Sequence, residues 1–313
     1  MRTVRRPACD ARGVEPTVEA MIVHHRTPEA LRRALERLAA HAPAVPVTVV
    51  DTALDDAVAL ALAAAHPRLR WLAAPNHSYA HAVNTGLKAT TAPLVATMNA
   101  DVLVGPRTLE DLCEPFADAR VAFSGPVART PGGRVQDQGL PYRWHHARLR
   151  RRSRRRAAGN APAWVAVPWL SGCLLVARRA AIERIGGMDG RLRFYNEDLE
   201  WCARGRAAGW RCALVATEVV HLGGAATPDD RRFLIEGLRG GYALTRRTAV
   251  PAARWAHRWA VAAAAGLAAA VARDPGRRTA WREVARRFAR GELDDSPFGG
   301  TLSDDAETTL RER

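Results

Sequence analysis

The stretch 97–101 places one carboxylate, Asp101, at the end of an apolar run that begins at Leu94. A run of this length between Pro93 and a polar turn predicts a strand buried on both faces, as in a parallel sheet. Ligands of open α/β sheets bind at the carboxyl ends of the strands, so Asp101 is well placed to hold a metal ion or a phosphate-bearing substrate. An aspartate that caps the turn before a helix starting at Pro106 would explain the same residue without any chemistry.

A second group of acidic residues lies at 196–200, where Asn196 is followed by Glu197, Asp198 and Glu200. Asn196 is suited to cap a helix, and the positive end of the helix dipole favours carboxylates in the first turn. This structural explanation predicts that Glu197 and Asp198 are both held ionised. Further along the chain, His221 precedes two glycines, and a lone histidine of this kind can be purely structural.

The elements that must position these residues alternate between strands and helices. The sequence predicts strands at 18–23, 47–50, 69–72 and 94–99, and helices at 28–38, 53–65 and 80–89. Such alternation predicts a parallel sheet with right-handed crossovers. Later segments predict strands at 121–124, 171–176 and 213–220, with helices at 179–185 and from Asn196 to Gly209.

Two stretches do not fit this alternation. From 126 to 164 we expect a long irregular loop, whose arginine run at 148–156 is either solvated or bound to lipid phosphate or nucleic acid. From 228 onward we expect helices only, at 231–245 and 253–272. The apolar part of the second helix is shorter than the roughly 20 strongly apolar residues that span a bilayer. Its flanking tryptophans and arginines suit a membrane surface, with packing on the catalytic domain as an equal alternative.

Composition sets broad limits on the class of protein. The chain has 313 residues, 48% of them hydrophobic, which is enough for the core of one large or two small globular domains. Its five cysteines form no CxxC pair and no secretory segment follows Met1, so we expect a reducing cytosolic compartment. The net charge of +15 comes from arginine, and it fits nucleic acid, an anionic membrane or an anionic substrate without choosing among them.

Taken in order, several motifs resemble those of family 2 glycosyltransferases, especially the bacterial rhamnosyltransferase-like branch with a GT-A fold. The resemblance covers about 18–226 and rests on the segments 24–26, 50–52, 76–86, 99–101, 169–173, 196–200 and 220–224. The chain departs from the family pattern where the first turn lacks Tyr-Asn, where Ser78 replaces a glycine and where Ala100 replaces a proline. These departures concern donor selectivity more than the chemistry.

The resemblance implies transfer of a sugar from a nucleoside diphosphate to an acceptor hydroxyl, with inversion at the anomeric carbon. It implies that Mg²⁺ or Mn²⁺ bridges the diphosphate, that Asp198 is the general base and that Glu197 orients it or the acceptor. The implied metal ligands are Asp101 and His221, the donor-binding residues are Asp51, Asn76, Asn84 and Asn99, and the acceptor-side residues are Ser171, Gly172 and Trp201. Turn and cap roles explain Asn76 and Asn84 equally well.

The domain prediction is a flexible tail at 1–17, a GT-A catalytic domain at 18–227 with the basic loop 126–164, and a helical extension at 228–313. We expect a dTDP-rhamnose or UDP-sugar donor and a lipid-linked or polysaccharide acceptor. We also expect a cytoplasmic protein, peripheral on the inner face of the cell membrane, with 148–156 and 251–273 as candidate contacts with anionic lipid. The oligomeric state stays open.

Three other functions were weighed. A basic nucleic-acid-binding protein is disfavoured because no helix-turn-helix, RRM or zinc-finger pattern is present and no aromatic residues interrupt the arginine run, so no nucleic acid is expected. A dinucleotide-dependent oxidoreductase lacks the glycine-rich turn after its first strand. A GT-A domain that binds a sugar nucleotide without catalysis stays open.

Overall fold

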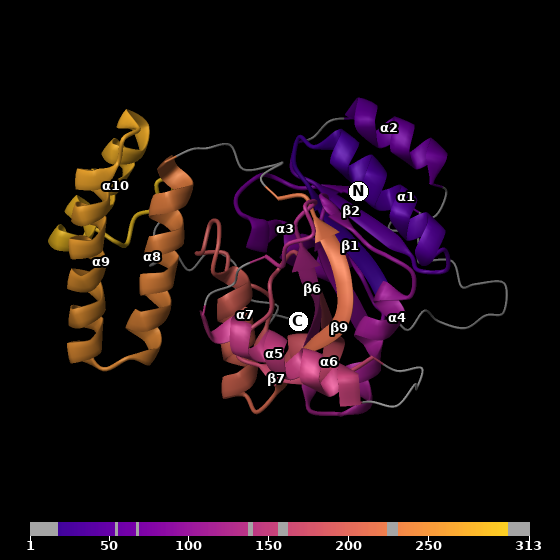
Figure 1. Ribbon diagram of the computed structural model, residues 1–313. Coiled ribbons are helices and arrows are strands. Elements are labelled where there is room, and N and C mark those ends of the chain that lie inside the picture. Colours follow the sequence, from indigo (N-terminus) through magenta and orange to yellow (C-terminus); the bar gives the residue numbers. More distant parts are fainter. Residues whose placement is uncertain are drawn as a thin grey trace.

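The computed structural model describes residues 18–53, 56–66, 69–136, 140–155, 162–223 and 231–299, and the predicted tail at 1–17 lies outside them. A nine-stranded sheet is flanked by helices, and further helices stand beside it (Figure 1). The strands are β1 (Val18–His24), β2 (Val47–Asp51), β3 (Leu69–Ala73), β4 (Leu94–Asn99), β5 (Val102–Leu103), β6 (Val121–Arg129), β7 (Trp164–Val167), β8 (Leu174–Arg178) and β9 (Arg211–His221). The helices are α1 (Pro28–His41), α2 (Asp56–Ala65), α3 (Tyr79–Ala89), α4 (Thr108–Cys113), α5 (Leu140–Arg155), α6 (Arg179–Ile185), α7 (Glu197–Ala207), α8 (Arg231–Thr248), α9 (Pro251–Val271) and α10 (Pro275–Arg290), with a 3-10 turn at Glu114–Ala117.

The sheet is mixed but mostly parallel, as predicted. Its strand order is β3-β2-β1-β4-β8-β6-β9-β5, with β7 also paired to β9. The strands β1 to β4 run parallel, β8 lies antiparallel between β4 and β6, and β9 runs parallel to β6. Most strands therefore end at one edge, and this edge carries Asp101 and His221.

Two apolar layers enclose the sheet because successive strand residues point to opposite faces. In β1, Met21 packs into a core that includes side chains of α3, α6 and α7, whereas its neighbour Ile22 packs into a core that includes side chains of α1 and α4. The alternation of buried residues along each strand thus fixes which helices cover which face. The prediction of an α/β fold is confirmed.

The prediction of an irregular loop over 126–164 is wrong for two segments, the end of β6 and the helix α5. β6 continues past Gly125 to Arg129, because a register shift between Gly125 and Val127 accommodates the glycine-proline pair within the strand. Most of the arginine run lies on α5, since arginine is a good helix former and Leu149 anchors the helix in the core. The run is thus a largely exposed helical face.

The described part of the C-terminal extension, 231–299, is mostly helical, as predicted, and α8, α9 and α10 have an apolar core of their own. The helix α10 was not predicted: its buried residues Ala280, Val284 and Phe288 recur at helical spacing, but arginines surround them. In Figure 1 these helices stand at one side, with α8 nearest the sheet. None of the helices in the described part of the chain is long and apolar enough to cross a membrane.

Candidate active site

Asp101 and His221 meet at the edge where β4 ends. The chain turns after β4 into β5, which pairs antiparallel with the end of β9 so that Val102 lies opposite His221. This pairing brings Asp101 Oδ1 to 3.2 Å from His221 Nε2 across a long sequence separation. The other carboxylate oxygen of Asp101 accepts from the backbone N–H of Gly223 at 3.1 Å. Both side chains keep part of their surface exposed, so a ligand can reach them.

Gln136 fixes the orientation of His221. Its amide nitrogen donates to the backbone oxygen of His221 at 3.3 Å, so its Oε1 is the atom that faces His221 Nδ1, at 2.9 Å. Nδ1 then donates to Gln136, and Nε2 faces Asp101 and Asn99, whose Nδ2 lies 3.4 Å away. A hydrogen bond of this kind on the far nitrogen is typical of metal-binding histidines.

The donor set suits a hard divalent cation. One carboxylate oxygen and one imidazole nitrogen 3.2 Å apart are spaced like neighbouring ligands around an ion with bonds of about 2.1 Å. Among the described residues no group of three or more His, Cys, Asp or Glu side chains could hold a metal. A cation here would therefore take its remaining ligands from substrate phosphates and water, as Mg²⁺ commonly does.

Asp198 is held at the start of α7 by backbone donors. The N–H of Gly172 donates to Asp198 Oδ2 at 2.7 Å, and the N–H of Leu199 donates to Oδ1 at 2.7 Å. A Cβ at position 172 would lie 3.2 Å from the Cβ of Asp198, so glycine permits this close approach. The hydroxyl of Tyr79 donates to the backbone oxygen of Gly172 at 3.1 Å and fixes the loop from the side of α3.

Burial overrides the helix dipole at Glu197 and Asp198. Burial, with the charge of Asp198 added, raises the pKa of Glu197 to about 8. Burial also raises the pKa of Asp198, although hydrogen bonds from Gly172 and Leu199 oppose the shift. The expectation that both groups are ionised is therefore wrong for Glu197, which keeps its proton at neutral pH. The Oε2 atom of Glu197 is buried without a partner.

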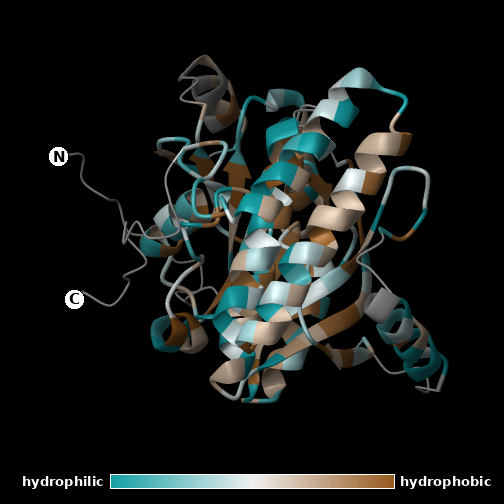
Figure 2. Ribbon diagram, turned by 90° about the vertical axis from the view of Figure 1, so that its left-hand side faces the viewer, coloured by the Kyte–Doolittle hydropathy of each residue, from teal (hydrophilic) through white to brown (hydrophobic). Residues whose placement is uncertain are grey.

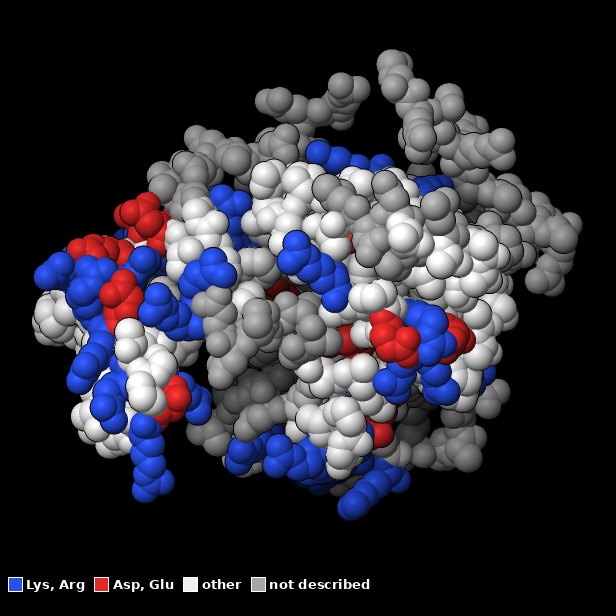
Figure 3. Space-filling model, turned by 90° about the horizontal axis from the view of Figure 1, so that it is seen from above, with Lys and Arg blue, Asp and Glu red and all other residues white. Residues whose placement is uncertain are grey.

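The two acidic groups belong to one site. The N–H of Asn99, at the end of β4, donates to the backbone oxygen of Cys173 at 2.9 Å, and Cys173 follows Gly172 directly. Burial raises the pKa of the Cys173 thiol to about 11, and the charges of Asp198 and Asp101 both add to the shift. Figure 3 looks from above onto the edge where the strands end and shows acidic atoms set back among white and blue ones. Asp101 and Asp198 thus flank one segment, 171–173.

A strained turn at Tyr195 and Asn196 sets the direction in which α7 begins. Tyr195 and Asn196 have φ of 68° and 70°, in the left-handed region that costs roughly 1–3 kcal/mol for such residues. Asn196 occupies the cap position but makes no capping bond; its Nδ2 donates instead to the backbone oxygen of Gly237 on α8, at 2.8 Å. A Cβ at Gly240 would lie 2.8 Å from the same nitrogen, so α8 approaches the turn as closely as a glycine allows.

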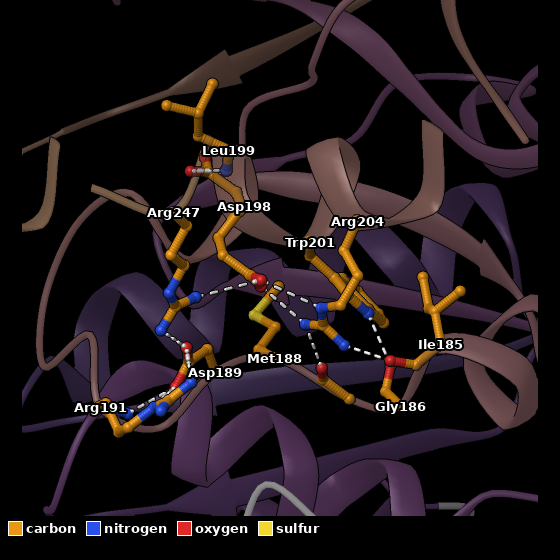
Figure 4. Close-up of polar contacts among 12 residues, drawn as sticks. Ile185, Gly186, Met188, Asp189, Arg191, Asp198, Leu199, Trp201, Arg204 and Arg247 are labelled. Atoms are coloured by element: carbon orange, nitrogen blue, oxygen red, sulfur yellow. Dashed lines mark hydrogen bonds and ion pairs between the residues drawn. The ribbon is translucent and has the colours of Figure 1, made fainter. Parts of the chain in front are cut away.

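Ion pairs link α8 to α7 and to the loop before α7 (Figure 4). Arg247 of α8 reaches Asp189 at 2.6 Å and Glu200 at 3.4 Å, and Arg191 also pairs with Asp189. Burial alone would raise the pKa of Asp189, but the hydrogen bonds from these two arginines outweigh it and lower the pKa to about 2. Arg204 continues the network from Glu200 to the backbone of Gly187. The C-terminal extension therefore contributes to the geometry of the site.

The residues predicted to bind the donor are only partly brought together. Asp51 is buried and its Oδ1 accepts from His24 Nδ1 and from the backbone N–H of Ala53, each at 2.9 Å. The N–H of Thr27 donates to the other nitrogen of His24, which fixes the proton on Nδ1. Asp51 therefore orders the first turn of the fold and is not at the surface.

Of the other residues predicted for the donor and acceptor sides, some hold the fold and others lie near the site. Asn84 is bound through both ends of its amide to the backbone of Met188, at 2.8 and 2.9 Å, which is the turn-holding role weighed for it. Trp201 was predicted on the acceptor side, but its ring is fully buried against Phe123 and its N–H donates to Gly186, so it is a core residue. Asn76 lies exposed before α3, and the backbone of Ser171 adjoins Gly172.

Sequence reasoning missed three residues that shape the site. Gln136 was assigned to an irregular loop, Tyr79 was quoted only as part of a motif, and Arg247 lies beyond the helix predicted at 231–245. A signal existed for Tyr79, because it follows Ser78, whose hydroxyl accepts from the N–H of His81 and caps α3. For Gln136 and Arg247 the pairing partners are distant in sequence, and no local pattern reveals them.

Comparison with known proteins gives the following matches. A family model described as "Glycosyltransferase like family 2" matches residues 16–262. The N-acetylglucosaminyl-diphospho-decaprenol L-rhamnosyltransferase of Mycobacterium tuberculosis is 32% identical over 145 residues, which are 41% of this chain and 46% of that protein. The chain thus spans about half the length of the curated relatives it matches.

Solved structures share the fold at low sequence identity. The mannosyltransferase PcManGT from Pyrobaculum calidifontis, in complex with GDP-Man and Mn²⁺, has a TM-score of 0.55 and 21% identity, over 90% of this chain and 86% of that one. TarS from S. aureus has a TM-score of 0.58 and 11% identity, over 89% and 50% of the two chains. These likenesses confirm the expected fold.

Proposed function

Because this chain belongs to glycosyltransferase-like family 2 and has the GT-A fold, we propose that it is an inverting, metal-dependent glycosyltransferase. It would move a sugar from a nucleoside-diphosphate donor to an acceptor hydroxyl. The observation that carries the proposal is the arrangement around 171–173: the Asp101–His221 pair on one side and the backbone-held Asp198 on the other. Inverting transfer needs a charge-stabilising group for the leaving diphosphate and a separate base for the acceptor.

In this mechanism Asp198 accepts the proton of the attacking hydroxyl. Two backbone N–H groups fix its carboxylate, and the protonated Glu197 beside it adds no repelling charge. A raised pKa makes the carboxylate a better proton acceptor than an ordinary surface aspartate.

Asp101 and His221 would hold Mg²⁺ or Mn²⁺ beside the diphosphate. When bound, the cation neutralises the charge that develops on the leaving group, an effect worth several kcal/mol. Gln136 holds Nδ1 of His221 and so orients Nε2 toward Asp101, with the Asn99 amide beside it. We assign the donor-binding role first to Asn99 and the exposed Asn76, and only indirectly to Asp51 and Asn84.

The donor and acceptor are proposed from the relative. The matched mycobacterial protein is named a rhamnosyltransferase acting on a diphospho-decaprenol lipid, which supports dTDP-rhamnose, with UDP-sugars as the alternative donors, and a lipid-linked or polysaccharide acceptor. Such an acceptor would place the enzyme in the cytoplasm, peripheral on the inner face of the cell membrane.

The experiment that tests the proposal compares the wild-type protein with Asp198→Asn. Both are incubated with dTDP-rhamnose or UDP-sugars, Mn²⁺ and a polyprenyl-diphospho-sugar acceptor, and product and anomeric configuration are read by NMR. We expect an inverted product from the wild type and a loss of at least about a hundredfold in the variant, by the usual contribution of a general base. Retained configuration, or full activity of Asp198→Asn, would contradict the assigned mechanism.

A further inference from the structure

The exposed face of α9 is apolar from end to end. Every residue of this helix that is exposed to solvent is apolar or glycine: Pro251, Ala252, Ala253, Trp255, Ala256, Trp259, Ala260, Ala263, Ala264, Gly266, Leu267, Ala270 and Val271. The helix has 21 residues and thus a length of about 32 Å at 1.5 Å per residue. We call this set of residues the α9 face.

The large side chains of the α9 face are well exposed. Trp255 is 64% exposed, Trp259 40%, Leu267 68% and Val271 72%, and Val250 directly before the helix is 67% exposed. Only two other large hydrophobic residues in the described part of the chain are exposed to this degree, Trp144 and Tyr195. Figure 2 looks onto α9 and α10 and shows the apolar stretch of α9 on the surface. Such a concentration marks an interaction surface.

The polar residues of α9 point the other way. Arg254 donates to the backbone oxygen of Ala249, His257 bonds to the hydroxyl of Thr245 on α8, and the guanidinium of Arg258 lies next to Gly291 beyond α10. An ordinary surface helix turns its charged side chains to water and its apolar ones to the core. The side-chain ends of Arg254 and His257 are thus used within the protein, and the guanidinium of Arg258 also lies over the ring of Trp259, 5.3 Å from its centre. The outer face is left apolar.

The positive charge around the α9 face favours an anionic partner. The segment 231–299 contains fourteen arginines and six acidic residues, and the whole chain has a net charge of +15. Exposed arginines flank both ends of the α9 face, Arg246 before the helix and Arg273 and Arg277 after it. A second copy of this chain would carry the same excess charge and would be repelled. An anionic lipid surface offers both an apolar interior for the α9 face and negative headgroups for the arginines.

We propose that the α9 face is a membrane-binding surface, on which α9 lies flat in the headgroup region of an anionic bilayer. Trp255 and Trp259 enter at the depth where amphipathic aromatic rings are favoured, and Leu267 and Val271 reach the acyl boundary. The surrounding arginines contact lipid phosphates. The inference is independent of the proposed catalytic function, since a protein without transferase activity would bind in the same way.

The test is co-sedimentation of the full-length protein with vesicles of phosphatidylglycerol and phosphatidylcholine, and with vesicles of phosphatidylcholine alone. We expect the wild type to bind the anionic vesicles, with affinity falling as salt is raised. The triple variant Trp255→Ser, Trp259→Ser, Leu267→Ser should lose more than about tenfold in affinity, because it removes the largest apolar groups. Thermal melting checks that these exposed substitutions leave the fold intact.

The matched control is Trp144→Ser, which removes an even more exposed tryptophan, 76%, from α5 instead of α9. We expect its vesicle affinity to equal that of the wild type. Equal loss in Trp144→Ser and in the triple variant would overturn the assignment to α9, as would equal binding of neutral and anionic vesicles. A wild-type dimer in sedimentation velocity that the triple variant dissociates, with no vesicle binding, would assign the α9 face to a second copy and refute the proposal.

Discussion

Replacing Glu197 by glutamine should stabilise the folded protein at alkaline pH and change its stability little at acid pH. In the folded state burial raises the pKa of Glu197 to about 8, whereas the pKa of a solvated glutamate, as in the unfolded chain, is 4.5. Below pH 4.5 the group is protonated in both states and adds no penalty. Between pH 4.5 and pH 8 Glu197 loses its proton in the unfolded chain but keeps it in the folded protein. The free energy of unfolding therefore falls as the pH rises through this range.

The magnitude follows from the size of the shift. A difference of one pKa unit corresponds to 1.36 kcal/mol, so a rise from 4.5 to about 8 costs at most about 5 kcal/mol once the pH exceeds 8. At pH 5 the cost is below about 1 kcal/mol by the same relation. Glutamine has the same shape and no charge in either state, so Glu197→Gln removes this cost. The gain over wild type should therefore be about 4 kcal/mol larger at pH 9 than at pH 5.

The assay is urea unfolding of the wild type and Glu197→Gln at pH 5, 7 and 9, with Glu183→Gln as the control. Glu183 is exposed on α6, so its variant should differ from the wild type by the same small amount at each pH. A difference between Glu197→Gln and the wild type that does not grow with pH would refute the conclusion that Glu197 is protonated at neutral pH. Growth of the difference in Glu183→Gln would point to a general charge effect instead.

Two further predictions concern residues that position the site. Gly240→Ala should lower kcat by roughly tenfold to a hundredfold with donor affinity unchanged, because its Cβ would lie 2.8 Å from the Asn196 amide and displace the strained turn. Gly241→Ala, whose Cβ meets Asn196 at an ordinary 3.7 Å, is the control and should stay active. Gln136→Leu should weaken Mn²⁺ binding in the presence of nucleotide by about 10–100-fold, since His221 loses its orienting partner. Unchanged Mn²⁺ affinity, measured by electron paramagnetic resonance, would show that Gln136 does not act on a metal ligand.

The sequence predicted best what depends on local periodicity. The buried runs of β1 and β4 and the apolar face of α1 are visible as patterns of period 2 and 3.6, and the structure has each of them close to the predicted bounds. Placing Asp101 at the end of β4 followed from the same reasoning. The meeting of Asp101 with His221 required the resemblance, because it results from the pairing of β5 with β9.

What the sequence could not predict depends on contacts between distant segments. The pKa of Glu197 is set by burial beneath other elements, which outweighs the local helix dipole. Trp201 lies in a plausible acceptor motif by spacing, yet packing against Phe123 places it in the core. The helix over 140–155 was missed because its arginines hide the buried anchor Leu149. The role of α8 at the Asn196 turn has no signature other than its glycines.

The central claim is that one site holds a metal-dependent donor centre at Asp101 and a separate base at Asp198. Calorimetric titration of the protein with UDP and dTDP, with and without Mn²⁺, tests it directly in the wild type, Asp101→Ala and Asp198→Asn. We predict that nucleotide binding requires Mn²⁺, is lost in Asp101→Ala and persists in Asp198→Asn. Mn²⁺-dependent binding that survives in Asp101→Ala, or that disappears in Asp198→Asn, would contradict this division of roles.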